Sequence, residues 1–252
     1  SNMKQLCLLI LFSFWIAETT HAGVNVLVIG SSHHFDAKES GQQPDRLNPE
    51  SVSTELEKIL NRGQRNGTSK VVFEDIYRTM STPVALGSKG NAIPTEFHCH
   101  SLAQYYFWPE GREARLKQLR GEDKTTWDYA VIVGDPYLID QMPGIFAEGV
   151  SLLASELTAN GKTKLVLLMP WLESEDSIEN LSEVCYRVGN GLEIPVAPAG
   201  EIVVGMGSIG RANAAYLSAA SIFSALSGKA AWGNQIQAKQ VLQAVKKNQS
   251  NR

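Results

Sequence analysis

The sequence feature that most constrains the fold is the segment NVLVIGSSHH at residues 25–34. Its apolar part ends at Gly30. The side chains that follow the glycine are Ser31, Ser32, His33 and His34. An unbroken apolar run is typical of a strand buried on both faces of a parallel sheet, and a glycine turn after such a strand presents reactive side chains at the carboxyl edge of the sheet. The segment therefore predicts an α/β protein with a serine-containing site at this edge.

The rest of the chain alternates apolar runs with amphipathic segments. The apolar runs predict strands at residues 71–73, 129–133, 164–169 and 194–197. The amphipathic segments predict helices at residues 51–61, 145–159, 177–188, 212–226 and 235–247, together with a broken helix over 97–120 and a long loop over 76–96. Helices between unbroken apolar strands indicate a parallel sheet that is covered on both faces.

The chain begins with a segment that we interpret as a targeting signal rather than as part of the fold. Residues 1–2 precede the first methionine and are interpreted as tag residues. The apolar run at residues 6–17 follows a lysine and precedes the small residue Ala22, as in a signal peptide, and it is shorter than the ~20 apolar residues of a membrane span. We therefore expect export to a periplasm or to the outside. The predicted organisation is a tag and signal peptide at residues 1–22, an α/β domain at residues 23–230, and a C-terminal helix and polar tail at residues 231–252.

The charge and the cysteines narrow the choice of partner and compartment. The formal net charge is −3, which is too small to predict a nucleic-acid or membrane surface. The cysteines of the mature chain are Cys99 and Cys185. They allow either one disulfide in an oxidising compartment or two free buried thiols.

Residues 202–210 match the dinucleotide fingerprint of a strand, Gly-x-Gly-x-x-Gly and a helix. That fingerprint also needs a βαβ unit and an acidic residue about 20 positions further on. No Asp or Glu follows Glu201, and the remaining chain is too short for a nucleotide domain. We therefore expect no cofactor and interpret the segment as a glycine-rich turn into a helix, where free amides and Arg211 could hold a small anion.

Three short motifs carry a resemblance to a known family. They are Gly30-Ser31-Ser32, WDYAVI at residues 127–132, and YLSAA at residues 216–220 leading to LSGK at residues 226–229. Together they resemble the SGNH (GDSL-like) hydrolase superfamily, and in particular a secreted bacterial branch of it, over most of residues 24–230. The resemblance implies a three-layer α/β/α sandwich with a flavodoxin-like parallel sheet, and an ester hydrolase whose nucleophile is Ser32.

The chain departs from this family at the other catalytic positions. The family places its base in an Asp-x-x-His turn before the last helix, where this chain has GMGSIGR at residues 205–211. No histidine follows His100, so a shifted alignment does not supply one. In the family's third sequence block an asparagine donates a hydrogen bond to the oxyanion, and this chain has GDPY at residues 134–137 instead. Asp135 would repel a developing oxyanion, and Pro136 has no backbone N–H. The residues expected around the oxyanion or the substrate are Ser31, Gly87, Gly90, Gly134, Asp135 and Arg211.

Four histidines are alternative candidates for the missing base. They are His33, His34, His98 and His100. The first two adjoin Ser32, and the other two lie in a region that often borders the active edge of this fold. The spacing of His98 and His100 also fits a metal site, because alternate residues of a strand share one face. The simpler interpretation is that these histidines are solvated or hydrogen-bonded locally.

These observations leave two main functions open. The first is hydrolysis of an acyl or carbohydrate ester by Ser32 with a non-standard base. The second is a catalytically inactive member of the fold that binds a glycan or a small anion in its cleft. A metal-dependent site at the histidines is a third alternative. The aromatic residues 105–108 and Trp171 either stack on sugar rings near the active edge or pack against the sheet.

Overall fold

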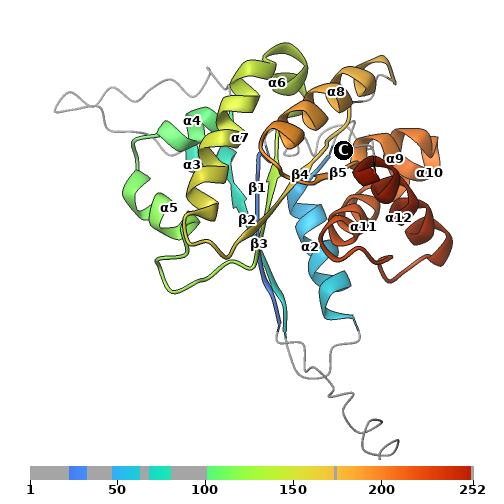
Figure 1. The fold of residues 1–252 in the computed structure, drawn as a ribbon, viewed down its shortest axis with the longest axis horizontal. Coiled ribbons are helices and arrows are strands. Elements are labelled where there is room, and N and C mark those ends of the chain that lie inside the picture. The colour runs from blue at the N-terminus through green and yellow to red at the C-terminus, as the bar shows by residue number, and fades with distance from the viewer. Residues whose placement is uncertain (1–22, 33–46, 63–67, 81–100, 173–174, 251–252) are drawn as a thin grey trace, which may run out of the picture.

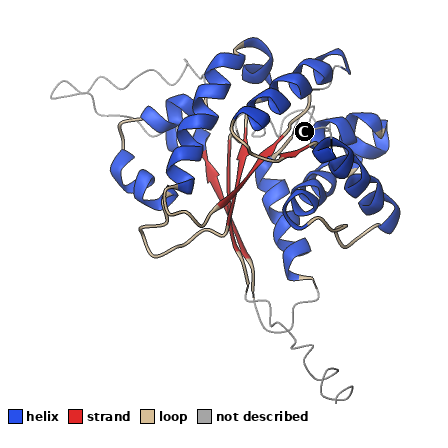
Figure 2. Cartoon of the chain, viewed as in Figure 1, coloured by secondary structure: helices blue, strands red, loops and turns tan. Residues whose placement is uncertain are grey.

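The computed structural model describes residues 23–32, 47–62, 68–80, 101–172 and 175–250. Within these residues the chain forms a five-stranded sheet in the order β2-β1-β3-β4-β5, with every neighbouring pair parallel. The strands are β1 (Asn25–Gly30), β2 (Lys70–Asp75), β3 (Tyr129–Val133), β4 (Lys164–Leu168) and β5 (Val196–Ala197). The carboxyl ends of the strands therefore share one edge of the sheet (Figure 2). The strand order is that of a flavodoxin-like fold, which confirms the predicted fold class.

Helices connect the strands and cover the sheet. They are α2 (Pro49–Asn61), α3 (Ile76–Met80), α4 (Leu102–Phe107), α5 (Arg112–Leu119), α6 (Pro136–Gln141), α7 (Pro143–Thr158), α8 (Glu175–Gly191), α9 (Ala199–Gly205), α10 (Gly207–Ala212), α11 (Ala214–Ser227) and α12 (Gln235–Ser250). The predicted helices correspond to α2, α7, α8, α11 and α12, with ends that differ by a few residues. No helix in the described residues is both long and apolar enough to cross a membrane.

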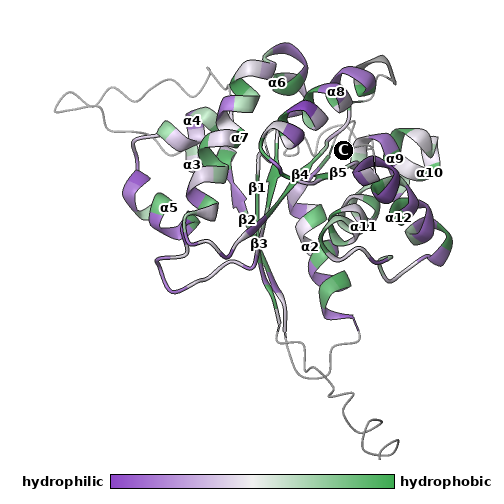
Figure 3. Ribbon diagram, in the orientation of Figure 1, coloured by the Kyte–Doolittle hydropathy of each residue, from purple (hydrophilic) through white to green (hydrophobic). Residues whose placement is uncertain are grey.

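The helices form two layers because the side chains of each strand alternate between the two faces of the sheet. In β1, Leu27 and Ile29 belong to the core beneath α4, α5, α7 and α8. Val26 and Val28 belong to the opposite core, beneath α2, α9, α11 and α12. Figure 1 shows the two groups of helices on either side of the sheet, and Figure 3 shows the apolar strands between them. The chain is thus a three-layer α/β/α sandwich.

The glycine-rich segment at residues 202–210 is helical. The apolar residues that the dinucleotide fingerprint requires as a strand lie in α9, and α10 follows them directly. A Cβ at Gly200 would lie 2.3 Å from the carbonyl oxygen of Pro170, and a Cβ at Gly210 would lie 2.1 Å from that of Val203. These glycines therefore permit close backbone packing, and the segment lacks the strand that a dinucleotide site needs.

The predicted broken helix is confirmed by α4 and α5, and a buried arginine joins the two. Arg115 of α5 donates hydrogen bonds to the carbonyl oxygens of Tyr105 at 2.9 Å, Trp108 at 2.6 Å and Glu110 at 2.8 Å. Its guanidinium carbon also lies 4.9 Å from the centre of the Tyr105 ring. Arg115 therefore pairs the carbonyl groups of Trp108 and Glu110 after the end of α4, and it shares the Tyr105 carbonyl with the backbone N–H of Trp108.

Replacing Arg115 with methionine is expected to lower the free energy of unfolding by about 2–3 kcal/mol. Methionine fills much of the volume but removes the three hydrogen bonds to the carbonyl groups of Tyr105, Trp108 and Glu110, each of which contributes about 1 kcal/mol. Urea denaturation of the purified protein measures the change. The matched control is Lys117→Met on the same helix, where an exposed ion pair with Glu113 at 3.6 Å is worth less than about 1 kcal/mol. Equal stability of the two variants would contradict the role assigned to Arg115.

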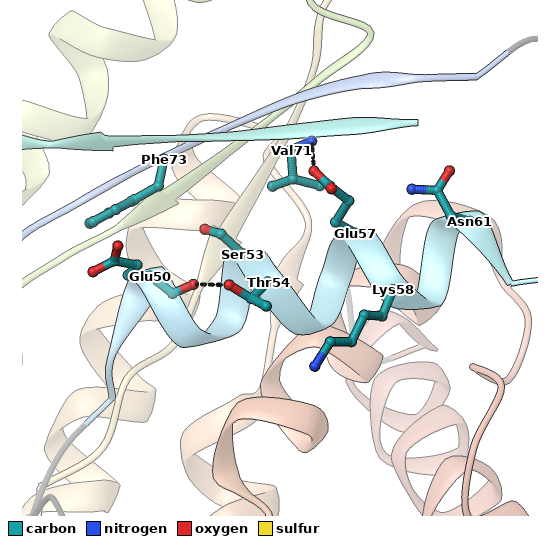
Figure 4. Close-up of a pocket in the computed structure, with 8 residues that line it drawn as sticks. All are labelled: Glu50, Ser53, Thr54, Glu57, Lys58, Asn61, Val71 and Phe73. Atoms are coloured by element: carbon teal, nitrogen blue, oxygen red, sulfur yellow. Dashed lines mark hydrogen bonds between the residues drawn. The ribbon is translucent and has the colours of Figure 1, made fainter. Parts of the chain in front are cut away.

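Helix α2 holds the outer strand β2 in position. The Glu57 carboxylate accepts a hydrogen bond from the backbone N–H of Val71 at 2.8 Å, beside a hollow of about 430 Å³ between α2 and β2 (Figure 4). The Asn61 side chain donates to the carbonyl oxygen of Ser69 at 2.9 Å and accepts from its N–H at 2.7 Å. Charged side chains beside an outer strand discourage pairing with another chain. These contacts also fix the strand that ends at Asp75.

Candidate active site

Two buried polar side chains lie together where β1 and β2 end. Gly30 is opposite Asp75 in the parallel register, and Ser32 lies two residues beyond Gly30. Ser32 is 6% exposed and Asp75 is 7% exposed. Burial of polar groups costs free energy unless they are hydrogen-bonded. In this site Ser32 and Asp75 are partners of each other.

The Asp75 carboxylate contacts Ser32 through both of its oxygens. Oδ1 accepts a hydrogen bond from the backbone N–H of Ser32 at 3.0 Å, and Oδ2 accepts a short hydrogen bond from Ser32 Oγ. Oδ1 also accepts from the backbone N–H of Tyr77 at 3.1 Å, which fixes the turn from β2 into α3. The serine hydroxyl therefore points its proton at Asp75.

An arginine balances the charge of this buried carboxylate. Arg78 Nε lies 3.2 Å from Asp75 Oδ2, and its Nη2 lies 3.7 Å from a carboxylate oxygen of Glu50 on α2. The Arg78 side chain is 64% exposed, so solvent screens much of the interaction. The pairing nevertheless avoids an uncompensated buried charge.

The arrangement has the first elements of a nucleophilic site. Ser32 donates its proton to a carboxylate and keeps both oxygen lone pairs, so loss of that proton to Asp75 would generate an alkoxide for attack. An aspartate carboxylate is a weaker base than the imidazole of a histidine. Asp75 also accepts from the two backbone N–H groups and from Arg78. The geometry therefore permits general-base chemistry but favours it less than a serine–histidine pair does.

The third-block residues Gly134 and Asp135 follow β3, the neighbour of β1. A Cβ at Gly134 would lie 2.5 Å from the ring of Phe146, so glycine allows α7 to pack closely against the end of β3. The Asp135 carboxylate accepts hydrogen bonds from the backbone N–H groups of Tyr137 at 2.9 Å and Leu138 at 3.4 Å. It therefore caps the N-terminus of α6. A contribution of either residue to oxyanion binding stays a prediction.

Two other predicted residues lie in the described part of the chain. Ser31 is half-buried and directly precedes Ser32. Arg211 is half-buried in α10, near the C-terminal end of that helix. The structure does not place Arg211 against Ser32 or Asp75 by any described contact, so its role in anion binding stays a prediction.

The remaining predicted site residues lie outside the residues that the structure describes. They are His33, His34, Gly87, Gly90, His98 and His100. The proposals of a histidine base, a metal site and an oxyanion glycine therefore stay predictions. Within the described ranges, no group of three or more His, Cys, Asp or Glu side chains is arranged to hold a metal ion.

The described aromatic and sulfur side chains serve mainly the core. Tyr105 and Trp171 are buried, which supports packing over sugar stacking for these two rings. Cys185 of α8 is a free thiol buried in the core, and burial raises its pKa above the ordinary thiol value. This environment disfavours the reactive thiolate. Cys99 lies outside the described residues.

Asp75 is the functional candidate that the sequence did not reveal. The apolar run that predicts β2 stops at Phe73, whereas the strand continues to Asp75. An acidic residue directly after a parallel strand is the signal that could have identified it, because carboxyl ends of neighbouring strands meet at one edge of the sheet. Its pairing with Ser32 depends on the register between β1 and β2, which local pattern does not determine.

Comparisons with known proteins support the fold. No protein-family model matches the chain. No curated protein matches it either. Among solved structures it is similar to a protein from Slackia heliotrinireducens described as a candidate SGNH hydrolase, with a TM-score of 0.52 and 13% sequence identity, over 82% of this chain and 100% of that one. At this identity the similarity shows a shared SGNH-hydrolase-like fold, in agreement with the resemblance of the three sequence motifs.

Proposed function

We propose that the protein is an exported ester hydrolase in which Ser32 is the nucleophile and Asp75 is the base. The observation that carries the proposal is the hydrogen bond from Ser32 Oγ to the buried carboxylate of Asp75. This pair lies at the carboxyl edge of a parallel sheet, where α/β proteins place their ligands. The similarity in fold to a candidate SGNH hydrolase agrees with this reaction class by analogy of fold.

The proposed reaction proceeds through an acyl-enzyme. Ser32 Oγ attacks the ester carbonyl carbon while its proton passes to Asp75 Oδ2. The tetrahedral intermediate collapses, the bond to the leaving oxygen breaks, and that oxygen takes the proton and departs as an alcohol. Water then attacks the acyl group and gives a proton to Asp75, which returns it to Ser32 as the carboxylic acid leaves. The expected substrates are acyl esters of small alcohols or of carbohydrates.

A catalytically inactive protein that binds a glycan or a small anion at the same edge is the second candidate. The observation that favours it is the number of donors on Asp75. Ser32 N–H, Ser32 Oγ, Tyr77 N–H and Arg78 Nε all contact this carboxylate. A carboxylate held in this way stabilises the turn, whether or not it accepts a proton during catalysis.

Labelling with a fluorophosphonate distinguishes the two candidates. Attack by Ser32 Oγ on phosphorus would expel fluoride and leave a covalent adduct, which peptide mass spectrometry can map. The hydrolase proposal predicts modification of Ser32 together with hydrolysis of p-nitrophenyl acetate. Absence of an adduct, or an adduct on Ser31, would refute the assigned nucleophile. Export is tested separately by N-terminal sequencing of the secreted protein, which should begin at Gly23.

A further inference from the structure

A second hollow lies in the helical layer formed by α2, α10, α11 and α12. Its volume is about 530 Å³, within the range of roughly 300–1,000 Å³ typical of small-molecule sites. Its aromatic and aliphatic lining residues include Ile209, Tyr216 and Trp232. Its polar lining residues include Arg62, Asn234 and Gln237.

This hollow is separate from the site at Ser32. Helix α2 begins next to the carboxyl edge of the sheet, because a Cβ at Gly30 would lie 3.1 Å from the Pro49 side chain. The helix ends near the start of β2, where Asn61 is hydrogen-bonded to Ser69. Arg62 directly follows the helix. The hollow and Ser32 therefore lie toward opposite ends of α2.

The turn between α11 and α12 presents an exposed indole at the hollow. Trp232 is 63% exposed. Gly233 follows it with φ of +143°, and a Cβ at this position would lie 2.5 Å from the Tyr216 hydroxyl. That hydroxyl donates a hydrogen bond to the carbonyl oxygen of Trp232 at 3.3 Å. The backbone that carries the indole is therefore held in place, although most of the residue is exposed to solvent.

Donor groups without described partners face the same hollow. Asn234 Oδ1 caps α12 by accepting from the backbone N–H groups of Ile236 at 3.1 Å and Gln237 at 3.4 Å. Among the described residues, the side chains of Arg62 and Gln237 make no hydrogen bond or ion pair. Burial raises the pKa of Tyr216, and the nearby positive charge of Arg62 opposes this shift. Arg62 therefore lies near Tyr216 within the same hollow.

We propose that this hollow binds an acidic saccharide, with a sugar ring against Trp232 and its acidic group paired with Arg62. A pyranose ring has an apolar C–H face and a rim of hydroxyl groups, which matches a flat indole beside amide donors. An arginine guanidinium recognises carboxylate and sulfate groups through paired N–H donors. The lining also contains the carboxylate of Glu55, which is paired with Lys58 at 2.7 Å. A peptide with only apolar anchors would leave these polar groups unpaired.

Isothermal titration of the purified protein with hexasaccharides tests the proposal. Oligogalacturonate and hyaluronan serve as acidic probes, and maltohexaose and cellohexaose serve as their neutral counterparts. The wild-type protein is expected to bind at least one acidic probe more tightly than its neutral counterpart. Trp232→Ala should weaken binding of that probe by about tenfold or more, since a lost stacking contact is worth roughly 1.4 kcal/mol. Arg62→Gln should weaken it by about fivefold without affecting the neutral probes.

Two control variants distinguish saccharide binding at this hollow from binding to exposed aromatic residues elsewhere and from binding at Ser32. Phe107→Ala removes an aromatic side chain that is 60% exposed on α4, in the other helical layer, and should bind the saccharide as the wild type does. Ser32→Ala should also bind normally, which keeps the outcome independent of the proposed hydrolase activity. Circular dichroism verifies the fold of each variant. Failure of the wild type to bind any probe, unchanged binding by Trp232→Ala, or loss of binding in Ser32→Ala would overturn the proposal.

Discussion

Replacing Ser32 with alanine is expected to abolish fluorophosphonate labelling and to reduce ester hydrolysis by at least about 10³-fold. Removal of the nucleophile eliminates the acyl-enzyme route and leaves only the contribution of substrate binding. Asp75 would retain its bonds to the backbone N–H groups of residues 32 and 77 and its contact with Arg78. The fold should therefore survive with a loss of about 1 kcal/mol in stability. Steady-state kinetics and intact-protein mass spectrometry measure the two functional effects.

The matched control is Ser53→Ala on α2. Ser53 is also a buried serine, and its hydroxyl donates to the carbonyl oxygen of Pro49 at 2.8 Å. Removing this hydroxyl eliminates a comparable hydrogen bond without altering the pair formed by Ser32 and Asp75. The Ser53→Ala variant should be labelled and should hydrolyse ester at the wild-type rate. If Ser32→Ala keeps the wild-type rate, the activity belongs to another residue and the assigned nucleophile is wrong.

The central strands could be predicted from sequence because their environment leaves a strong pattern. β1, β3 and β4 lie inside the sheet, and helices cover both of its faces, so apolar residues occupy successive positions in each strand. The turn at Ser32 is equally local, since a glycine ends an apolar run there. The order of the strands in the sheet could not be predicted from these local patterns alone. It agrees with the fold of the family that the three short motifs resemble.

The remaining features depend on contacts between segments that are distant in sequence. In α9, the residues Ile202 and Val203 are β-branched and apolar, which favours a strand locally. They form a helix instead, and its packing depends on distant contacts: Gly200 lets α9 approach Pro170, and Gly210 lets α10 approach Val203 of α9. Asp75 is a similar case. A charged residue at the end of β2 resembles a surface residue until the parallel register places it beside Ser32.

Replacing Asp75 with asparagine is expected to lower ester turnover by 10²–10⁴-fold, the usual contribution of a general base. Asparagine has nearly the same shape and can still accept hydrogen bonds from the backbone N–H groups of Ser32 and Tyr77. It cannot take the proton of Ser32 Oγ, and its amide nitrogen would face Arg78 Nε as a second donor. Stability should fall by only about 1–2 kcal/mol. The loss is small because Arg78 is exposed, so water can replace the carboxylate as its partner. Single-turnover kinetics and urea denaturation measure these effects separately.

A control carboxylate at the other edge of the sheet separates base catalysis from structural support. Asp128 Oδ2 accepts a hydrogen bond from the backbone N–H of Asn25 at 2.8 Å, where β1 begins. Asp128→Asn should therefore cost stability while the rate per folded molecule stays at the wild-type value. In Asp75→Ala, a small external base such as formate should restore part of the lost turnover, since it can accept the proton of Ser32. If Asp75 has only a structural role, the Asp75→Ala variant should be less stable than the wild type, formate should not change its turnover, and Ser32 should be labelled at the wild-type rate. That combination would assign the base to another residue and leave Asp75 as the group that holds the Ser32 turn in place.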